Sequence, residues 1–288
     1  MSQPPITCYH ICYDDQTKES CPPEFTPLYH ENQYPDFKEI FPIMNCLLER
    51  EWKEGEFVGF FSPKFSQKTG LSPKSVFDAL GKYGKTNMVI CFTSYWEFAA
   101  YWLNPWEQAD YSNPGVLEIS QALADKINAN IDLMSACVSM NKVAFSHFLI
   151  APRPFWDEWL RITQIYLELL SSSKELAERR TDYRGSSHLI HPFIIERVPT
   201  LILLINDFAS IQFMDEIYAA PDMKQKTNLF RMDQFKKDFS RDGKQRTLDQ
   251  YWEYRIAFSK GGQIFTKTAQ HFLKHRNIKV TERSVTIS

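Results

Sequence analysis

Glu196 and Arg197 form the charged pair best placed to do chemistry. They stand inside an apolar segment, Phe193-Ile-Ile-Glu-Arg-Val198. Glutamate and arginine are almost never fully buried unless they are paired, and a buried charge that loses its partner costs about 3–5 kcal/mol. Two interpretations follow. The pair is a structural salt bridge, or Glu196 is a pocket carboxylate beside an arginine that reaches for phosphate.

A second polar group occupies a turn-rich segment between two expected helices. This group supplies an aromatic ring on which a sugar can stack, and two carboxylates and an amide that can hydrogen-bond sugar hydroxyls. Its residues are Trp106, Glu107, Gln108 and Asp110. The Asn-Pro-Gly sequence at 113–115 is typical of a turn. A plain polar loop therefore explains this segment equally well.

Histidines offer further candidates. His147 shares a face of an expected strand with Phe145 and Leu149, which favours a hydrogen-bonded core histidine over a ligand contact. His188 and His191 flank the start of the segment that contains Glu196. Their spacing suits a metal only if both lie on one helical turn, and no third ligand is evident.

Polar residues also follow the first two expected strands. Lys64 comes after the apolar run at 57–61, where it would contact a diphosphate or simply lie on the surface. Tyr9, His10 and Asp14 occupy the equivalent place at the first strand. A nucleotide base or ribose would lie there, although none of these residues is specific alone.

Apolar periodicity predicts the elements that position these residues. We expect strands at residues 6–13, 57–61, 87–92 and 143–150, with a long connection over 14–37. We expect a helix that begins at Ser72-Pro73 and ends at Gly81 or Gly84, and further helices at residues 96–103, 115–127, 154–170 and 248–258. Another helix should begin at His191 and be interrupted at Pro199, and a last one should end near His275. Alternating strands and helices predict an α/β fold, with a mainly parallel sheet flanked by helices. Ligands of such sheets bind beyond the carboxyl ends of the strands.

Composition restricts the class of protein. Of 288 residues, 43% are hydrophobic and 24% charged, which is ordinary for a globular chain. The six cysteines form no CxxC pair, so buried free thiols in a reducing cytoplasm are expected. The N-terminus has no signal-peptide pattern. The longest apolar run, residues 193–205, carries polar residues and is shorter than the ~20 residues of a membrane span. We therefore expect a soluble cytoplasmic protein.

Charge is distributed unevenly along the chain. Residues 222–288 hold 15 Lys/Arg against 7 Asp/Glu, whereas the rest holds 18 against 28. A basic C-terminal segment would dock on anionic lipid at the inner membrane, bind phosphate groups, or pair with the acidic body. No recognised nucleic-acid motif accompanies the charge, so nucleic acid is not an expected partner.

Several familiar signatures are missing. The chain has no P-loop, no GxGxxG, no GxSxG and no HExxH. It also lacks Asp-x-Asp, the pair that many sugar-nucleotide transferases use to hold a divalent metal. No metal-ligating residues are therefore predicted.

Five short segments occur in an order that resembles the glycosyltransferase-like proteins encoded in bacterial capsule and lipopolysaccharide clusters. The resemblance covers roughly residues 6–215. The segments are Tyr9-His-Ile-Cys-Tyr-Asp14, Gly59-Phe-Phe-Ser-Pro-Lys-Phe65, Asn104-Pro-Trp-Glu-Gln108, Phe145-Ser-His-Phe-Leu-Ile150 with Phe155-Trp156, and Ile195-Glu-Arg-Val198.

The resemblance implies a fold like that of the A-type nucleotide-sugar transferases over residues 1–215, followed by a helical basic extension over 216–288. By analogy, Tyr9, His10 and Asp14 would lie near the nucleotide and Lys64 near the diphosphate. Glu107 and Gln108 would lie near the donor sugar, with Glu196 as base and Arg197 stabilising charge. Trp106 and His147 complete the expected substrate-binding set.

The implied reaction is transfer of a sugar from a nucleotide-diphosphate donor to a glycan or lipid-linked acceptor. The absent Asp-x-Asp departs from the usual pattern of that fold and puts a divalent metal cofactor, and activity itself, in doubt. Two alternatives stay open. One is a non-catalytic carbohydrate-binding or scaffolding subunit of a polysaccharide assembly complex, and the other is a sugar-phosphate transferase.

Overall fold

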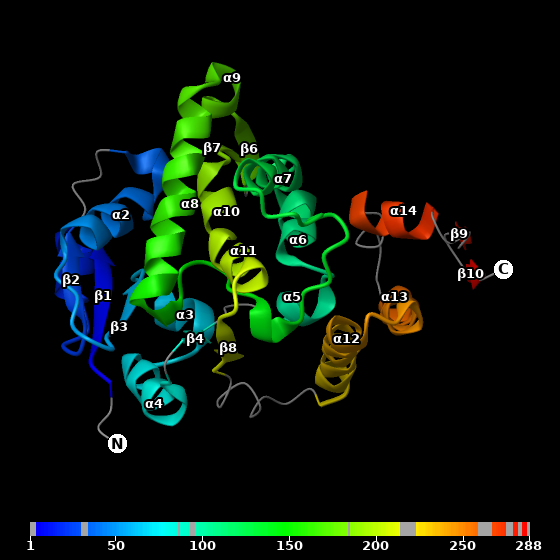
Figure 1. The fold of residues 1–288 in the computed structure, drawn as a ribbon, viewed down its shortest axis with the longest axis horizontal. Coiled ribbons are helices and arrows are strands. Elements are labelled where there is room, and N and C mark those ends of the chain that lie inside the picture. Colours follow the sequence, from blue (N-terminus) through cyan, green and yellow to red (C-terminus); the bar gives the residue numbers. More distant parts are fainter. Residues whose placement is uncertain are drawn as a thin grey trace.

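The computed structural model describes residues 4–29, 34–85, 87–92, 96–183, 185–213, 223–258, 267–274, 279–281 and 284–286. Its centre is a six-stranded sheet in the order β2-β1-β3-β5-β4-β8 (Figure 1). The strands of this sheet are β1 (Ile6–Cys12), β2 (Thr26–Tyr29), β3 (Phe57–Phe61), β4 (Met88–Cys91), β5 (Leu149–Pro152) and β8 (Ala209–Gln212). Neighbours pair in parallel except β5, which runs antiparallel to both β3 and β4.

Helices surround the sheet. Their bounds are α1 (Asp15–Glu19), α2 (Ile40–Glu49), α3 (Phe65–Thr69), α4 (Pro73–Tyr83), α5 (Trp96–Tyr101), α6 (Pro105–Ser112), α7 (Val116–Lys126), α8 (Arg153–Ser171), α9 (Lys174–Ala177), α10 (His191–Ile195), α11 (Val198–Ile205), α12 (Met223–Asp242), α13 (Gln245–Phe258) and α14 (Lys267–Lys274). The 3-10 turns η1 (Pro35–Phe37) and η2 (Met140–Lys142) and two hairpins, β6 (Arg180–Tyr183) with β7 (Ser186–Leu189) and β9 (Lys279–Thr281) with β10 (Ser284–Thr286), complete the described elements.

Side-chain alternation along β3 explains why helices cover both faces of the sheet. Val58 and Phe60 point into the core formed with α2, α8, α10 and α11. Phe57 and Phe61 point to the opposite face and pack with residues of α3 and α4. Every residue of β3 is buried, as expected for a strand with both faces covered. The helix α8 crosses the front of the sheet in Figure 1.

The helices after residue 222 complete a second apolar core. Leu229, Met232, Tyr251 and Trp252 pack with buried residues of α5, α6 and α7. A buried ion pair between Glu107 and Arg255, 2.8 Å apart, joins α6 to α13. In Figure 1 these helices lie on the side of the molecule away from β1 and β2. The described part of the predicted C-terminal extension is therefore packed against the body through its helices.

The structure confirms the predicted α/β class, with a mostly parallel sheet between helices. The strand at 57–61 and the helix that begins at Pro73, capped by Ser72, are as predicted. Three expectations are wrong. The connection over 14–37 contains β2, the strand expected at 143–150 begins only at Leu149, and the turn-rich segment expected around Trp106 is the helix α6. The sequence analysis did not predict β8. Among the described residues, no helix combines the length and apolar character needed to cross a membrane.

Candidate functional site

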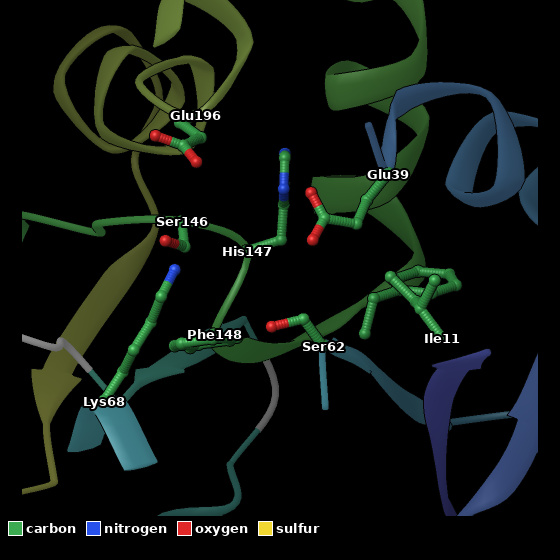
Figure 2. Close-up of a pocket in the computed structure, with 9 residues that line it drawn as sticks. Ile11, Glu39, Ser62, Lys68, Ser146, His147, Phe148 and Glu196 are labelled. Carbon is green, nitrogen blue, oxygen red and sulfur yellow. The ribbon is translucent and has the colours of Figure 1, made fainter. Parts of the chain in front are cut away.

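A polar pocket opens at the edge of the sheet where β1 and β3 end. Its lining residues come from five regions of the chain and are Ile11, Glu39, Phe60, Ser62, Lys68, Ser146, His147, Phe148 and Glu196 (Figure 2). This is the carboxyl edge of the parallel strands, the edge at which open α/β sheets bind ligands. The cavity volume is about 20 Å³, which is room for a single water-sized group.

Glu196 reaches the pocket because the helix is broken beside it. α10 ends at Ile195, α11 begins at Val198, and Pro199 lies in the first turn of α11. A proline interrupts a continuing helix but is tolerated in a first turn. The side chain of Glu196 is 30% exposed. Burial raises the pKa of this carboxyl group above its usual value, against the opposing effects of Arg197 and Lys68.

Arg197 points away from the pocket. Its guanidinium donates to the carbonyl oxygens of Phe193 and Pro105, at 2.6 and 3.2 Å, and to Oε1 of Gln108 at 3.2 Å. Its Nη1 also lies 3.5 Å from Oε2 of Glu196. Arg197 therefore ties α6 to the helix break, and Glu196 faces the cavity. A role for Arg197 in binding phosphate stays a prediction.

His147 stands between two carboxylates. Figure 2 shows its ring between the side chains of Glu39 and Glu196. The residue is 6% exposed, and its Nε2 atom has no hydrogen-bond partner among the described residues. Ser146 precedes it with a φ of 58°, a left-handed conformation that is uncommon for a residue other than glycine. That conformation is also why the expected strand does not extend through this segment.

Glu39 is a site residue that the sequence interpretation missed. It precedes α2, and Oε1 accepts a 2.5 Å hydrogen bond from the hydroxyl of Tyr13. The residue before it, Lys38, has a φ of 52°. The amphipathic spacing of Ile40, Ile43, Met44 and Leu47 was the available signal, because it predicts a helix whose start lies at this position.

Lys68, not Lys64, lines the pocket. Lys64 is the exposed N-cap residue of α3, whereas Lys68 lies one turn later, with its ammonium group 5.5 Å from the ring of Phe148. In Figure 2 this ammonium group reaches up beside Ser146 toward Glu196. Residues four apart share one face of a helix. Lys68 therefore places positive charge in the pocket, and Lys64 lies one helical turn before it on the exposed surface.

This arrangement suits proton transfer from a hydroxyl group. A carboxyl group with a raised pKa is a better proton acceptor than an ordinary one. The neutral imidazole and the hydroxyls of Ser62 and Ser146 can hold a bound oxygen in place. Lys68 keeps the deprotonated form of Glu196 accessible, because its charge lowers the pKa that burial raises.

The buried imidazole predicts a pH-dependent stability. Burial lowers the pKa of His147 from 6.5 to about 4, although Glu39 opposes the shift. Between pH 6.5 and pH 4 the unfolded chain binds more protons at His147 than the folded chain does. His147 therefore does not reduce the free energy of unfolding above pH 6.5, and it reduces this free energy progressively as the pH falls toward 4. From pH 7 to pH 5, we expect the free energy of unfolding to fall by about 2 kcal/mol more in the wild type than in His147→Phe.

Urea unfolding of both proteins at the two pH values measures this difference. Phenylalanine keeps an aromatic ring against Trp159, whose ring lies 5.4 Å from the imidazole. Burial also lowers the pKa of His10 and His191. These histidines remain in both proteins, so their contribution cancels. Parallel pH profiles for the two proteins would show that His147 is not held neutral by burial.

Three residues expected near a nucleotide are engaged in local contacts. Tyr9 stacks on Phe60 with ring centroids 5.3 Å apart. His10 is buried, and its Nε2 lies 3.2 Å from the carbonyl oxygen of Thr17. The exposed carboxylate of Asp14 caps α1 by accepting from the backbone N–H of Thr17. A nucleotide-binding role for Tyr9, His10 and Asp14 stays a prediction.

The structure places Trp106 and Glu107 away from the pocket. Both are 1% exposed, so Trp106 is core rather than an open platform. Glu107 pairs with Arg255 and accepts a 3.0 Å hydrogen bond from the backbone N–H of Leu103. Gln108 contacts Arg197 instead of lining the cavity. The reason is the packing of α12 and α13, which covers this segment.

His188 and His191 have different surroundings in the structure. Both ring nitrogens of His191 are engaged, Nδ1 with the hydroxyl of Tyr166 at 2.8 Å and Nε2 with the carbonyl oxygen of Ala177 at 2.9 Å. His188 lies on β7 and packs edge-on against Tyr183. In the described part of the chain, no group of three or more His, Cys, Asp or Glu residues is arranged to hold a metal ion.

The chain matches no protein-family model, no curated protein and no solved structure at a significant level.

Proposed function

We propose that this protein transfers a sugar from a nucleotide-diphosphate donor to a hydroxyl of a surface-polysaccharide acceptor. The observation that carries the proposal is the position of Glu196, a carboxylate with a raised pKa in a small polar pocket at the carboxyl edge of the sheet. General bases in enzymes are tuned in this way by burial and by neighbouring charges. The sugar-nucleotide part of the proposal rests on the resemblance of residues 6–215.

In the proposed reaction, Glu196 takes the proton of the acceptor hydroxyl as its oxygen attacks the anomeric carbon. The bond from that carbon to the diphosphate breaks, and the nucleoside diphosphate leaves with the electron pair. Lys64, the exposed N-cap residue of α3, would stabilise the charge of the leaving group outside the pocket. Arg197 contributes by holding the helix break that aims Glu196.

The fold proposed for this activity is that of the A-type nucleotide-sugar transferases, and the place of action is the cytoplasmic face of the inner membrane. Basic residues after position 222 would hold the protein against anionic lipid there. Of the described residues in this region, Lys236 and Arg255 are fully buried. The exposed basic residues, such as Arg241 and Lys244, would make the membrane contact.

A thermal-shift screen against nucleotide sugars and nucleoside diphosphates, with and without Mg²⁺ or Mn²⁺, tests the proposal. A ligand at ~100 times its dissociation constant adds about 2.7 kcal/mol to the free energy of unfolding, so we expect a clear rise in melting temperature with one donor. Release of nucleoside diphosphate would then show turnover, whereas release of the monophosphate would indicate a sugar-phosphate transferase. No shift with any nucleotide or nucleotide sugar would contradict the proposal and favour a non-catalytic carbohydrate-binding subunit.

A further inference from the structure

The size of the pocket restricts what can enter it. A cavity of about 20 Å³ admits one oxygen-sized group. A hydroxyl projecting from a sugar ring fits among the lining side chains as they stand, whereas a whole ring or a phosphate group fits only if those side chains move. With the side chains in these positions, the diphosphate of a donor lies outside the cavity.

The charges that line the pocket also favour an uncharged ligand group over phosphate. Glu39 and Glu196 place two carboxylates around the cavity, against the single ammonium group of Lys68. A phosphate would meet two carboxylates and one ammonium group at close range, which disfavours a further negative ion there. An uncharged group meets no such repulsion.

The hydrogen-bonding atoms that have no described partner indicate which donors and acceptors a bound uncharged group needs. Nε2 of His147 is buried without a described partner. Tyr13 donates to Oε1 of Glu39, which fixes that carboxylate and leaves Oε2 as an acceptor. A hydroxyl group has one donor and two acceptor lone pairs. It can donate to a carboxylate while accepting from the imidazole N–H and the ammonium group of Lys68, so it satisfies the atoms that the protein leaves open.

The backbone is strained at the residue immediately before each of two of these side chains. Lys38 and Ser146, with φ values of 52° and 58°, immediately precede Glu39 and His147. Strain of this kind costs on the order of 1–3 kcal/mol per residue and collects at binding sites. It aims the carboxylate and the imidazole from two unrelated segments into one cavity.

We propose that this pocket is the subsite for one uncharged hydroxyl of the acceptor sugar, and that Glu39 and His147 are the residues that select it. Tyr13 is a positioning residue that acts through Glu39. The inference rests on the proposed function for the identity of the ligand as an acceptor. It goes beyond the proposed function in two ways. It assigns Glu39, which lies in none of the sequence motifs, to acceptor binding, and it excludes phosphate from the cavity.

Nuclear magnetic resonance of the full chain with ¹⁵N-labelled histidine tests the assignment. The probes are a panel of methyl hexopyranosides, which are uncharged and carry free hydroxyls, and inorganic phosphate. We expect at least one hexoside to shift the Nε2 resonance of His147 saturably, and phosphate to leave it unmoved. A shift with phosphate, no shift with any hexoside, or hexoside binding that leaves Nε2 unmoved would each overturn the inference.

Variants show whether Glu39 contributes. A hydrogen bond to a charged group is worth more than one to a neutral group, so Glu39→Gln should weaken hexoside binding about tenfold. Tyr13→Phe should weaken it less, because the carboxylate remains but is no longer held. Glu49→Gln, an exposed carboxylate at the other end of α2, is the matched control and should bind as the wild type does. Wild-type affinity in Glu39→Gln would remove Glu39 from the subsite.

The outcomes separate this inference from the proposed function. A nucleotide sugar that binds and turns over, while no hexoside moves His147, would support the transferase and overturn the subsite. Hexoside binding at His147 without any nucleotide-sugar binding would support the subsite and contradict the transferase. Glu39→Gln also leaves the lysines of α3 intact, so donor binding should not change.

Discussion

Replacing Arg255 by methionine is expected to lower the free energy of unfolding by about 3–5 kcal/mol, because it leaves a buried carboxylate without its partner. The side chains of Arg255 and Glu107 are both 0% exposed, and Nη1 of Arg255 lies 2.8 Å from Oε2 of Glu107. The rings of Tyr101, Trp102 and Trp252 surround the guanidinium, with centroids 4.8, 4.8 and 4.9 Å away. Methionine keeps the apolar contacts but not the charge. Urea unfolding at neutral pH measures the loss.

The matched control for this variant is Arg241→Met. Arg241 pairs with Asp238 on the same pair of C-terminal helices, but its side chain is 73% exposed, and exposed pairs contribute only about 0–1 kcal/mol. The double variant Glu107→Gln/Arg255→Met should recover part of the stability, because the buried carboxylate is gone. A loss below about 1 kcal/mol for Arg255→Met would show that water reaches Glu107.

Replacing Glu196 by glutamine is expected to reduce the rate of sugar transfer about 10²–10⁴-fold, the usual contribution of a general base. The amide keeps the size of the side chain and removes the proton acceptor. Release of nucleoside diphosphate from the donor found by thermal shift measures the rate. In the wild type, the rate should rise with pH through an inflection above the usual glutamate value of 4.5, because burial raises the pKa of Glu196.

Stability and a surface variant control this experiment. Glu196→Gln removes a charge 3.5 Å from the buried guanidinium of Arg197, so some stability should be lost, and turnover is compared at a temperature at which both proteins are folded. Glu118→Gln, on the exposed face of α7, should transfer sugar at the wild-type rate. Unchanged turnover in Glu196→Gln would assign the base to another group, and Glu39 would be the next candidate in the same pocket.

Local sequence signals predicted most of the body and failed where distant contacts decide. Ser72-Pro73 fixed a helix start because capping and a preset φ act within one turn. β2 was missed because Thr26-Pro-Leu-Tyr29 is a short, exposed edge strand that forms by pairing with β1. A proline is tolerated on an edge strand, but it removes the usual strand signal.

The sequence predicted only part of the candidate site, again because distant contacts decide the rest. Glu196 was recognisable because a charge inside an apolar run must find a partner. The sequence predicts a site role for Lys64 because this residue directly follows a strand, whereas the short helix α3 places Lys68, one turn later, at the cavity. The local sequence suggested that Glu107 is accessible, but in the structure it is paired with Arg255 of α13, which lies 148 residues later in the chain. Burial by a distant segment leaves no mark on the local pattern.

The antiparallel strand β5 has a consequence for how the chain acquires its structure. It lies between β3 and β4, yet it is synthesised long after both. During translation, β3 emerges with β1 on one side and no neighbour on the other until Leu149–Pro152 leaves the ribosome. Pairings between residues so far apart slow folding, and the waiting strand edge is open to other chains. A nascent chain from which residues 149–152 have not yet emerged therefore exposes a strand edge with which another chain can pair.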